Sequence, residues 1–376
     1  MYIGENGSGK SRKLSCLSKQ HIEQEKKVLA IATSNNDRFP RRNPHKDYHY
    51  MGVRLGRFVA IEAIKGAFKK VYKNHDHFLR NIFKILDYVG YENKIGIKVN
   101  GFSENPVELL EEFRRKSDIQ DFPKSWSHEQ TTDLFLDITR LQQQLKGKLD
   151  EIIWAAEGLN STFLADESLV ALFANEKLFK KAKIFKSIDI ILEKNGHKFD
   201  LSDASSGELS LISTAAFISS RINPESGPVS IFIDEPENSL HPKWQKNYLS
   251  NLLNIFPYNR IDFFIATHSP LVVDGAVKED NADVFRYQNG RFVLLEQKSR
   301  NIEDALIDQF DIVTSENNAL SERCIDLIND TSSGKIDQSQ ALFEISRYKS
   351  FSQESNQLEF LNGVVDIIKG LNNAKG

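Results

Sequence analysis

The residues from Gly4 to Ser11 read Gly-Glu-Asn-Gly-Ser-Gly-Lys-Ser and fit the pattern G-x-x-x-x-G-K-[ST] at every position. A short apolar stretch, Tyr2-Ile3, precedes this run, and apolar residues at helical spacing follow it. In that setting glycines let successive backbone N–H groups surround phosphate oxygens at the positive end of the following helix. The run predicts a phosphate loop, in which Lys10 contacts the β- and γ-phosphates and Ser11 holds Mg²⁺. A glycine-rich turn that caps a helix beside a chance lysine is the alternative.

Two later apolar segments each run directly into polar residues. Ile231-Phe232-Ile233 is followed by Asp234 and Glu235, and the strand from Ile261 to Ala266 is followed by Thr267 and His268. Because one predicted helix, which contains Trp244, Tyr248 and Leu252, separates the two strands, we expect them to be parallel and to end at the same edge of a sheet. Asp234 is expected to hold Mg²⁺, and Glu235 to orient and deprotonate an attacking water. A solvated strand terminus and a core histidine are the alternatives.

The third motif is Ser205-Ser206-Gly207-Glu208, which opens a helix that runs toward Ile218. Ser206 is expected to cap this helix, and Gly207 to allow a close approach of the backbone. The helix N-terminus is then a second candidate anion site.

Taken with Glu237 to Pro242, these motifs resemble the ATP-binding-cassette ATPase superfamily. Asp-Glu-Pro-Glu-Asn-Ser-Leu-His-Pro is similar to the AAA-type ATPases of the RecF/SMC-like branch. That branch includes overcoming-lysogenization-defect-related ATPases and bacterial anti-phage ATPases such as those associated with Septu and retrons. The resemblance covers about residues 1–35 and 185–300.

The resemblance implies ATP and Mg²⁺ as ligands. The residues that it assigns to ATP binding are Asn6, Gly7, Ser8, Gly9, Lys10, Ser11, Ser206, Gly207 and Ser239. The metal ligands that it implies are Ser11 and Asp234, and the catalytic residues are Glu235 and His268. It also implies that Ser206 and Gly207 act on the nucleotide held by a second subunit, in a dimer that closes on ATP.

The sequence departs from the usual pattern of that family in two ways. No glutamine is placed as the Q-loop, and only three residues precede Gly4. Arg38 and Phe39 follow the second predicted strand, and stacking on the adenine base is one role for them; a solvated basic loop is the other.

The expected fold class is α/β, an ATPase head with a mixed or parallel sheet interrupted by an insertion. We expect head segments at residues 1–53 and 185–300, a mostly helical insertion at 54–184 and a helical C-terminal region at 301–376. The pairs Asn195-Gly196 and Asn289-Gly290 each predict a β-hairpin. The insertion has no sustained heptads, which favours a compact lid over a coiled-coil arm.

The composition of the chain limits the kinds of partner that it can bind. With 49 Lys+Arg against 52 Asp+Glu, contact with DNA or RNA requires a local basic patch, for which Arg38, Arg41, Arg42 and Lys46 are candidates. No apolar run approaches the ~20 residues of a membrane span. Two cysteines and the absence of a signal-peptide pattern favour the cytoplasm, with no membrane partner.

The expected function is a Mg²⁺-dependent ATPase that forms a homodimer or higher oligomer and regulates a separate effector, a nuclease or toxin, in anti-phage defence or DNA processing. A nuclease within the chain is not expected, because residues 270–376 contain no Asp-x-Asp. The alternatives are an ATP-dependent assembly switch with little turnover and, less favoured, the nucleotide-binding subunit of a transporter. The amphipathic residues after 301 are expected to dock a partner or to oligomerise, with packing on the head as the alternative.

Overall fold

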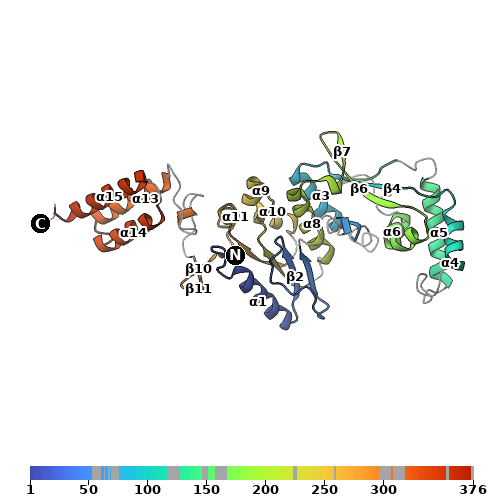
Figure 1. The fold of residues 1–376 in the computed structure, drawn as a ribbon, viewed down its shortest axis with the longest axis horizontal. Helices are drawn as coiled ribbons and strands as arrows, with labels where there is room; N and C mark the ends of the chain where they lie inside the picture. Colours follow the sequence, from blue (N-terminus) through green and yellow to red (C-terminus); the bar gives the residue numbers. More distant parts are fainter. Residues whose placement is uncertain are drawn as a thin grey trace.

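The computed structural model describes residues 1–52, 61–62, 64–66, 68, 76–116, 128–145, 151–156, 167–222, 227–257, 260–295, 306–307, 318–352 and 355–373. Figure 1 shows an α/β region around β2 and α1, a second region around β4 and α5, and a C-terminal group of helices around α14.

The α/β region is built on a seven-stranded sheet. Its strands are β1 (Tyr2–Ile3), β2 (Lys27–Ala32), β3 (Tyr48–Gly52), β8 (Val229–Asp234), β9 (Ile261–Thr267), β10 (Phe285–Gln288) and β11 (Arg291–Leu294). The order is β11-β10-β1-β9-β8-β2-β3, and every neighbouring pair is parallel except the β10–β11 hairpin. The predicted mixed α/β sheet is thereby confirmed. The two-residue β1 lies between β9 and β10, so pairing on both sides holds the short strand that leads into Gly4.

The helices that accompany this sheet are α1 (Lys10–Glu23), α8 (Ser206–Arg221), α9 (Pro242–Lys246), α10 (Tyr248–Ile255) and α11 (Pro270–Ala276). The sequence suggested a single helix through Trp244, Tyr248 and Leu252. It is instead two helices, because Asn247 leaves helical geometry at φ −100° and ψ 13° and ends α9 where α10 begins. α8 is buried over most of its length, including the hydroxyl residues Ser213, Thr214, Ser219 and Ser220.

The second region holds a four-stranded antiparallel sheet in the order β5-β4-β6-β7. Its strands are β4 (Lys94–Asn100), β5 (Ile153–Ala156), β6 (Ser187–Lys194) and β7 (His197–Asp200). The accompanying helices are α3 (Asp76–Val89), α4 (Pro106–Lys116), α5 (His128–Leu145), α6 (Glu167–Ala174), α7 (Glu176–Lys181) and the 3₁₀ turn η2 (Leu201–Asp203). The hairpin at Asn195-Gly196 is confirmed, but it pairs with β4 and not with the seven-stranded sheet.

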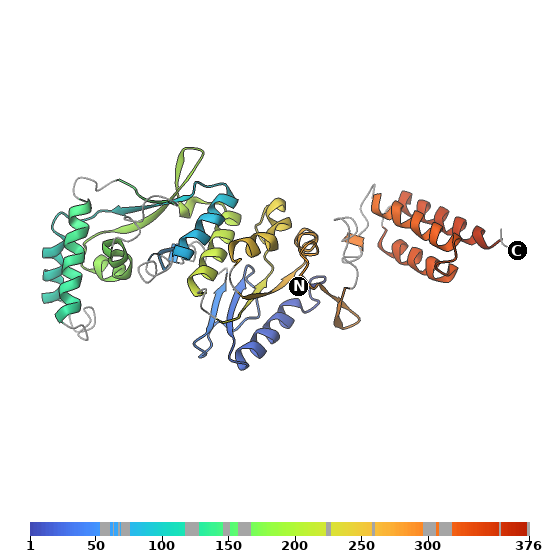
Figure 2. The same cartoon turned by 180° about the vertical axis from the view of Figure 1, so that it is seen from behind.

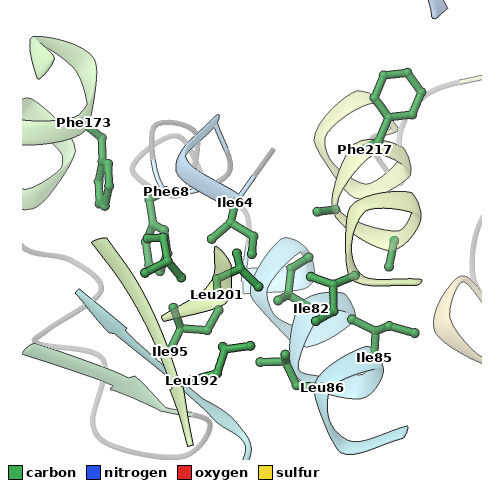
Figure 3. Packing of buried hydrophobic residues seen from close by; sticks show 14 of the residues in the cluster. Ile64, Phe68, Ile82, Ile85, Leu86, Ile95, Phe173, Leu192, Leu201 and Phe217 are labelled. Atoms are coloured by element: carbon green, nitrogen blue, oxygen red, sulfur yellow. The ribbon is translucent and has the colours of Figure 1, made fainter. Parts of the chain in front are cut away.

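Helix α3 joins the two regions through its apolar faces. Ile82, Ile85 and Leu86 are buried at helical spacing. Figure 3 shows them between α8, which carries Phe217, and β6, which carries Leu192. These side chains belong to one continuous apolar core, so α8 and the four-stranded sheet are held by the same packing.

The C-terminal helices are α13 (Asn318–Ser332), α14 (Gln338–Phe351) and α15 (Ser355–Asn373). They share a separate apolar cluster that includes Leu320, Ile345 and Leu361. Figure 2 shows them packed together, apart from the helices of the seven-stranded sheet. Within the described ranges, no helix has the length and apolar character needed to cross a bilayer.

Candidate active site

Residues 4–11, the phosphate loop, connect β1 to α1. Gly7 and Gly9 have φ values of 86° and 91°, in the left-handed region that disfavours side chains. A Cβ at either glycine would meet no atom within 4 Å, so conformation rather than space requires glycine there. Gly9 precedes the first turn of α1 and no side chain caps that turn. The first N–H groups of α1 are therefore available to an anion.

Lys10 folds back on the same loop. Its Nζ donates to the carbonyl oxygens of Gly4 at 2.7 Å and Glu5 at 2.8 Å, and the residue is 5% exposed. Burial lowers the pKa of Lys10, and nearby carboxylates oppose that shift. Those carboxylates belong to Glu235, Glu237, Asp234 and Glu5. The Lys10 ammonium thus lies in the field of the acidic strand end. Of the other loop residues, Asn6 is exposed and Ser8 Oγ is buried without a hydrogen-bond partner.

Asp234 ends β8 and is 1% exposed. Its Oδ1 accepts a hydrogen bond from Ser11 Oγ at 3.0 Å, whereas its Oδ2 is buried and has no hydrogen-bond partner. Burial raises the pKa of Asp234 to about 6. A hydroxyl and a carboxylate with a free oxygen are the hard ligands that Mg²⁺ prefers, and a cation there would offset the cost of burying the charge. The residues present therefore fit Mg²⁺.

Glu235 begins residues 235–241, here called the acidic loop, with a φ of 55°. Strain of this kind in a non-glycine residue persists only where neighbouring contacts fix it. Such contacts are present: Glu235 N donates to Ala266 O at 2.8 Å, and Asn238 Nδ2 donates to Glu235 Oε2 at 3.1 Å. Thr33, which follows β2, also donates its hydroxyl to the carbonyl oxygen of Glu235. The sequence placed Asn238 in the motif from Glu237 to Pro242 without assigning it this contact, and it did not single out Thr33.

His268 follows β9 and contacts Glu237 of the acidic loop. Oε1 of Glu237 accepts from the backbone N of His268 at 2.7 Å and lies 2.9 Å from its Nδ1. The contact with Glu237 raises the pKa of His268, with Glu235 adding to the shift and both burial and Lys10 opposing it. The structure thus brings together Lys10, Ser11, Asp234, Glu235 and His268, as the sequence predicted for a shared strand edge.

The signature turn, residues 205–208, begins α8. Ser205, not Ser206, is the cap: its hydroxyl accepts from Glu208 N, and the Glu208 carboxylate accepts from Ser205 N. The prediction that Ser206 caps this helix is therefore wrong, by one residue. The spacing S-x-x-E of a capping box was the signal that identifies Ser205. Ser206 is left exposed at the first position of the helix.

Gly207 makes room for the acidic loop of its own chain. A Cβ at Gly207 would lie 2.5 Å from the backbone oxygen of Ser239 and 3.1 Å from Cζ3 of Trp244. Ser239 is itself exposed, with a φ of 66°. Gly207 therefore has a packing role inside the subunit.

A groove of about 700 Å³ opens beside this contact, between the end of α3, the start of α8, the acidic loop and α9. Its walls include Tyr88, Gly90, Ser206, Ser239, Lys243 and Trp244. The groove places Ser206 and Ser239 on one surface. In the described ranges no hydrogen bond joins Ser206 or Gly207 to the phosphate loop.

The structure of the loop after β2 does not fit one role expected for it, the stacking of Phe39 on the adenine base. Phe39 is 5% exposed and belongs to the apolar cluster that contains Leu14 and Phe232. It cannot stack on a base without leaving that cluster, so the stacking interpretation is wrong for Phe39. The candidate basic residues of this loop, Arg38, Arg41, Arg42 and Lys46, are all exposed.

Comparisons with known proteins place the chain among ATPase relatives. The sequence model of the family described as "AAA domain, putative AbiEii toxin, Type IV TA system" matches residues 73–274, just over half of the chain. Retron Vc95 probable ATPase of Vibrio cholerae serotype O1 biovar El Tor is 34% identical over 131 residues, which is 32% of this chain and 25% of that protein. The matched model and this relative confirm the resemblance drawn from the motifs.

Two longer matches extend over most of the chain. Retron Ec83 probable ATPase of Escherichia coli is 23% identical over 77% of this chain and 67% of its own length. Septu protein PtuA of Bacillus mycoides strain KBAB4 is 23% identical over 82% of this chain and 40% of its own length. The matches thus span between a quarter and two thirds of the length of these relatives.

Among solved structures, the chain overlaps an Smc head domain with an extended coiled coil bound to the C-terminal domain of ScpA, from Pyrococcus furiosus. The identity is 12%, the overlap covers 58% of this chain and 55% of that chain, and the TM-score is 0.22.

Proposed function

Because the chain belongs to this AAA domain family, we propose that it binds ATP and hydrolyses it to ADP and phosphate with Mg²⁺. One observation carries the proposal: Ser11 Oγ donates to Asp234 Oδ1 at 3.0 Å, while Asp234 Oδ2 stays buried and unpaired. This contact joins the end of the phosphate loop to the acidic strand end across the sheet edge. A hydroxyl and a buried carboxylate are ligands of the kind that bind Mg²⁺ beside substrate phosphates, and this supports the proposal.

In the proposed reaction each residue has a role set by its position. The uncapped N–H groups of α1 and the Lys10 ammonium bind the phosphates, once Lys10 leaves the carbonyl oxygens of Gly4 and Glu5. Mg²⁺, held by Ser11 Oγ and Asp234, would neutralise the charge that develops between the β- and γ-phosphates.

Glu235 then orients the attacking water and accepts its proton. Asn238 holds one oxygen of the Glu235 carboxylate at 3.1 Å, which leaves Oε1 for the water. His268 follows β9, which pairs with β8 at the same sheet edge, and we expect its ring to contact the γ-phosphate that Lys10 binds.

The test compares Lys10→Ala with Lys19→Ala. Both lysines lie on α1, but Lys19 is exposed and outside the site. Loss of a charged donor to phosphate costs about 1.5–3 kcal/mol, or roughly a 10- to 150-fold weaker binding of a fluorescent ATP analogue. Lys19→Ala should bind and hydrolyse as wild type. An unchanged affinity in Lys10→Ala would contradict the proposal.

We further propose that two subunits close on ATP, with Ser206 of one subunit facing the nucleotide of the other. The support is the exposed Ser206 at a helix start and the groove that it shares with Ser239. Gly207 is unsuitable as a probe, since any side chain there would displace Ser239. Ser206→Asp adds a carboxylate at an exposed first helical position, which the helix dipole tolerates.

The measurement mixes Ser206→Asp with Lys10→Ala protein. A mixed dimer carries both lesions in one composite site and neither in the other, so partial recovery of hydrolysis is expected. Normal hydrolysis by Ser206→Asp alone would contradict action across the interface.

The relatives named for retron and Septu systems support a role in bacterial anti-phage defence, in which this ATPase regulates a separate effector, a nuclease or toxin. Co-expression with the neighbouring genes followed by affinity purification tests this role. We expect a stoichiometric nuclease or toxin to co-elute, and its absence under ATP, ADP and nucleotide-free conditions would count against the effector.

A further inference from the structure

Glu237 is a buried acidic residue to which the sequence motifs assign no role. It lies in the acidic loop and is 6% exposed. Burying a carboxylate is costly unless donors pair with it, so its partners indicate why it is there. Its Oε1 receives the backbone N–H of His268 at 2.7 Å and approaches Nδ1 of the same ring at 2.9 Å. Both partners belong to His268, the residue that follows β9.

The contact fixes which nitrogen of His268 is free. An oxygen that already accepts a backbone N–H and carries negative charge requires a proton on the neighbouring Nδ1. The ring is not aligned for a hydrogen bond from Nδ1, so at 2.9 Å the contact is an ion-pair approach. Nε2 is then the ring atom left to face a ligand. The His268 side chain is 40% exposed, so the ring is accessible while Glu237 is not.

The charges on the two partners agree with an ion pair. Burial alone would raise the pKa of Glu237, but its hydrogen bonds, first those with His268 and then those with its own backbone and Thr267, outweigh burial and lower it. The same contact raises the pKa of His268. The other charged groups that act on the His268 ring are Glu235, which favours its protonation, and Lys10, which opposes it.

A ring of hydrogen bonds ties this pair to the acidic loop. Ser269 Oγ donates to Gln245 Oε1 at 2.6 Å, and Gln245 Nε2 donates to Leu240 O at 2.9 Å. Leu240 N in turn donates to Glu237 O at 3.0 Å. His268 is therefore held at both sides, by the Glu237 carboxylate and through its neighbour Ser269.

We propose that Glu237 is a positioning residue for His268, which holds Nδ1 so that Nε2 presents an N–H to the γ-phosphate. The proposal rests on the proposed ATPase function for its ligand. Its geometry, however, concerns residues of this chain alone and can be tested without turnover. Because the ring of hydrogen bonds includes Leu240, beside Ser239, the orientation of His268 is also coupled to the loop against which Gly207 packs.

The test uses Glu237→Gln, which keeps the side-chain volume and can still accept the backbone N–H of His268. The matched control is Glu176→Gln. Glu176 is also a buried glutamate, paired with Lys65 at 2.8 Å and Lys180 at 2.7 Å, but it lies on α7. The control reports what losing a buried ion pair does to the fold in general.

The first readout is independent of catalysis. The Hε1 resonance of His268, assigned by its loss in His268→Gln, is titrated by NMR. We expect its midpoint in wild type to lie above that in Glu237→Gln, where it returns toward the ordinary histidine value of 6.5. Glu176→Gln should titrate as wild type. An identical midpoint in wild type and Glu237→Gln would overturn the proposal, whether or not the protein hydrolyses ATP.

The second readout is kinetic. A misplaced reacting group costs about tenfold or more in rate, so kcat should fall by roughly that factor in Glu237→Gln while KM for ATP changes little. The alkaline limb of kcat should also move to lower pH. Equal losses in Glu237→Gln and Glu176→Gln would assign Glu237 to folding alone. If wild type itself does not hydrolyse ATP, the proposed function fails while the NMR result still decides the role of Glu237.

Discussion

Replacing Gly207 with alanine tests the contact between the signature turn and the acidic loop. The added Cβ would lie 2.5 Å from Ser239 O, whereas ordinary contact begins at 3.4 Å, so the two backbones must separate by about 0.9 Å. Overpacking of this kind costs about 1–3 kcal/mol. Alanine in a helix returns about 0.5–1 kcal/mol relative to glycine. The net loss is therefore about 1 kcal/mol.

The assay is thermal unfolding together with ATP hydrolysis. A loss of about 1 kcal/mol lowers Tm by roughly 2–4 °C in a unit of this size. The matched control is Gly227→Ala, since Gly227 is exposed, has no positive φ and would meet nothing within 4 Å. It should melt at or slightly above wild type. Hydrolysis by Gly207→Ala should fall more than ATP binding, because the clash moves the loop that begins with Glu235. A Gly207→Ala protein that matches the control in both measurements would refute the packing argument.

Three further predictions concern charge and the C-terminal helices. Asp234→Asn removes a buried carboxylate whose pKa is raised to about 6. In a chelator at pH 8 the variant should therefore have a Tm equal to or higher than that of wild type, and it should no longer be stabilised by Mg²⁺ and ATP. A lower Tm in chelator would contradict this prediction. In the folded protein the pKa of His268 is raised from 6.5 and that of Glu237 is lowered from 4.5. The coupling free energy of the two residues in a double-mutant cycle of unfolding should therefore be present at pH 6 and shrink by pH 9, because His268 loses its proton. Equal coupling at both pH values would contradict the ion pair. Removal of residues 318–376, whose helices have their own core, should preserve basal hydrolysis and abolish effector binding in a pull-down; loss of both would indicate packing on the head.

Local patterns predicted the parts of the structure that depend on neighbouring residues. The phosphate loop depends on glycines within eight consecutive positions, and both hairpins depend on an Asn-Gly pair in the left-handed region. The helix break at Asn247 escaped detection because Trp244, Tyr248 and Leu252 keep a four-residue spacing across it. Periodicity reports which face is apolar, not whether the backbone is continuous.

Contacts between distant segments account for what the sequence could not predict. Glu237 and His268 are separated by 31 positions, and nothing near either residue marks the pairing. The contact of Gly207 with Ser239 likewise depends on how α8 approaches the acidic loop. β5 was not expected as a strand, since its pairing with β4 is what makes it one. The motifs thus identified which residues meet at the strand edge, while packing determined how each is held.

The most direct test of the central claim is the identity of the nucleotide recovered from the protein after incubation with ATP and Mg²⁺. Glu235→Gln keeps the side-chain volume and the partner Asn238 but removes the base that accepts the proton of water. We expect wild type to yield ADP and Glu235→Gln to retain intact ATP at wild-type stoichiometry. Conversion of ATP by Glu235→Gln at the wild-type rate, or no bound nucleotide in either protein, would contradict the account.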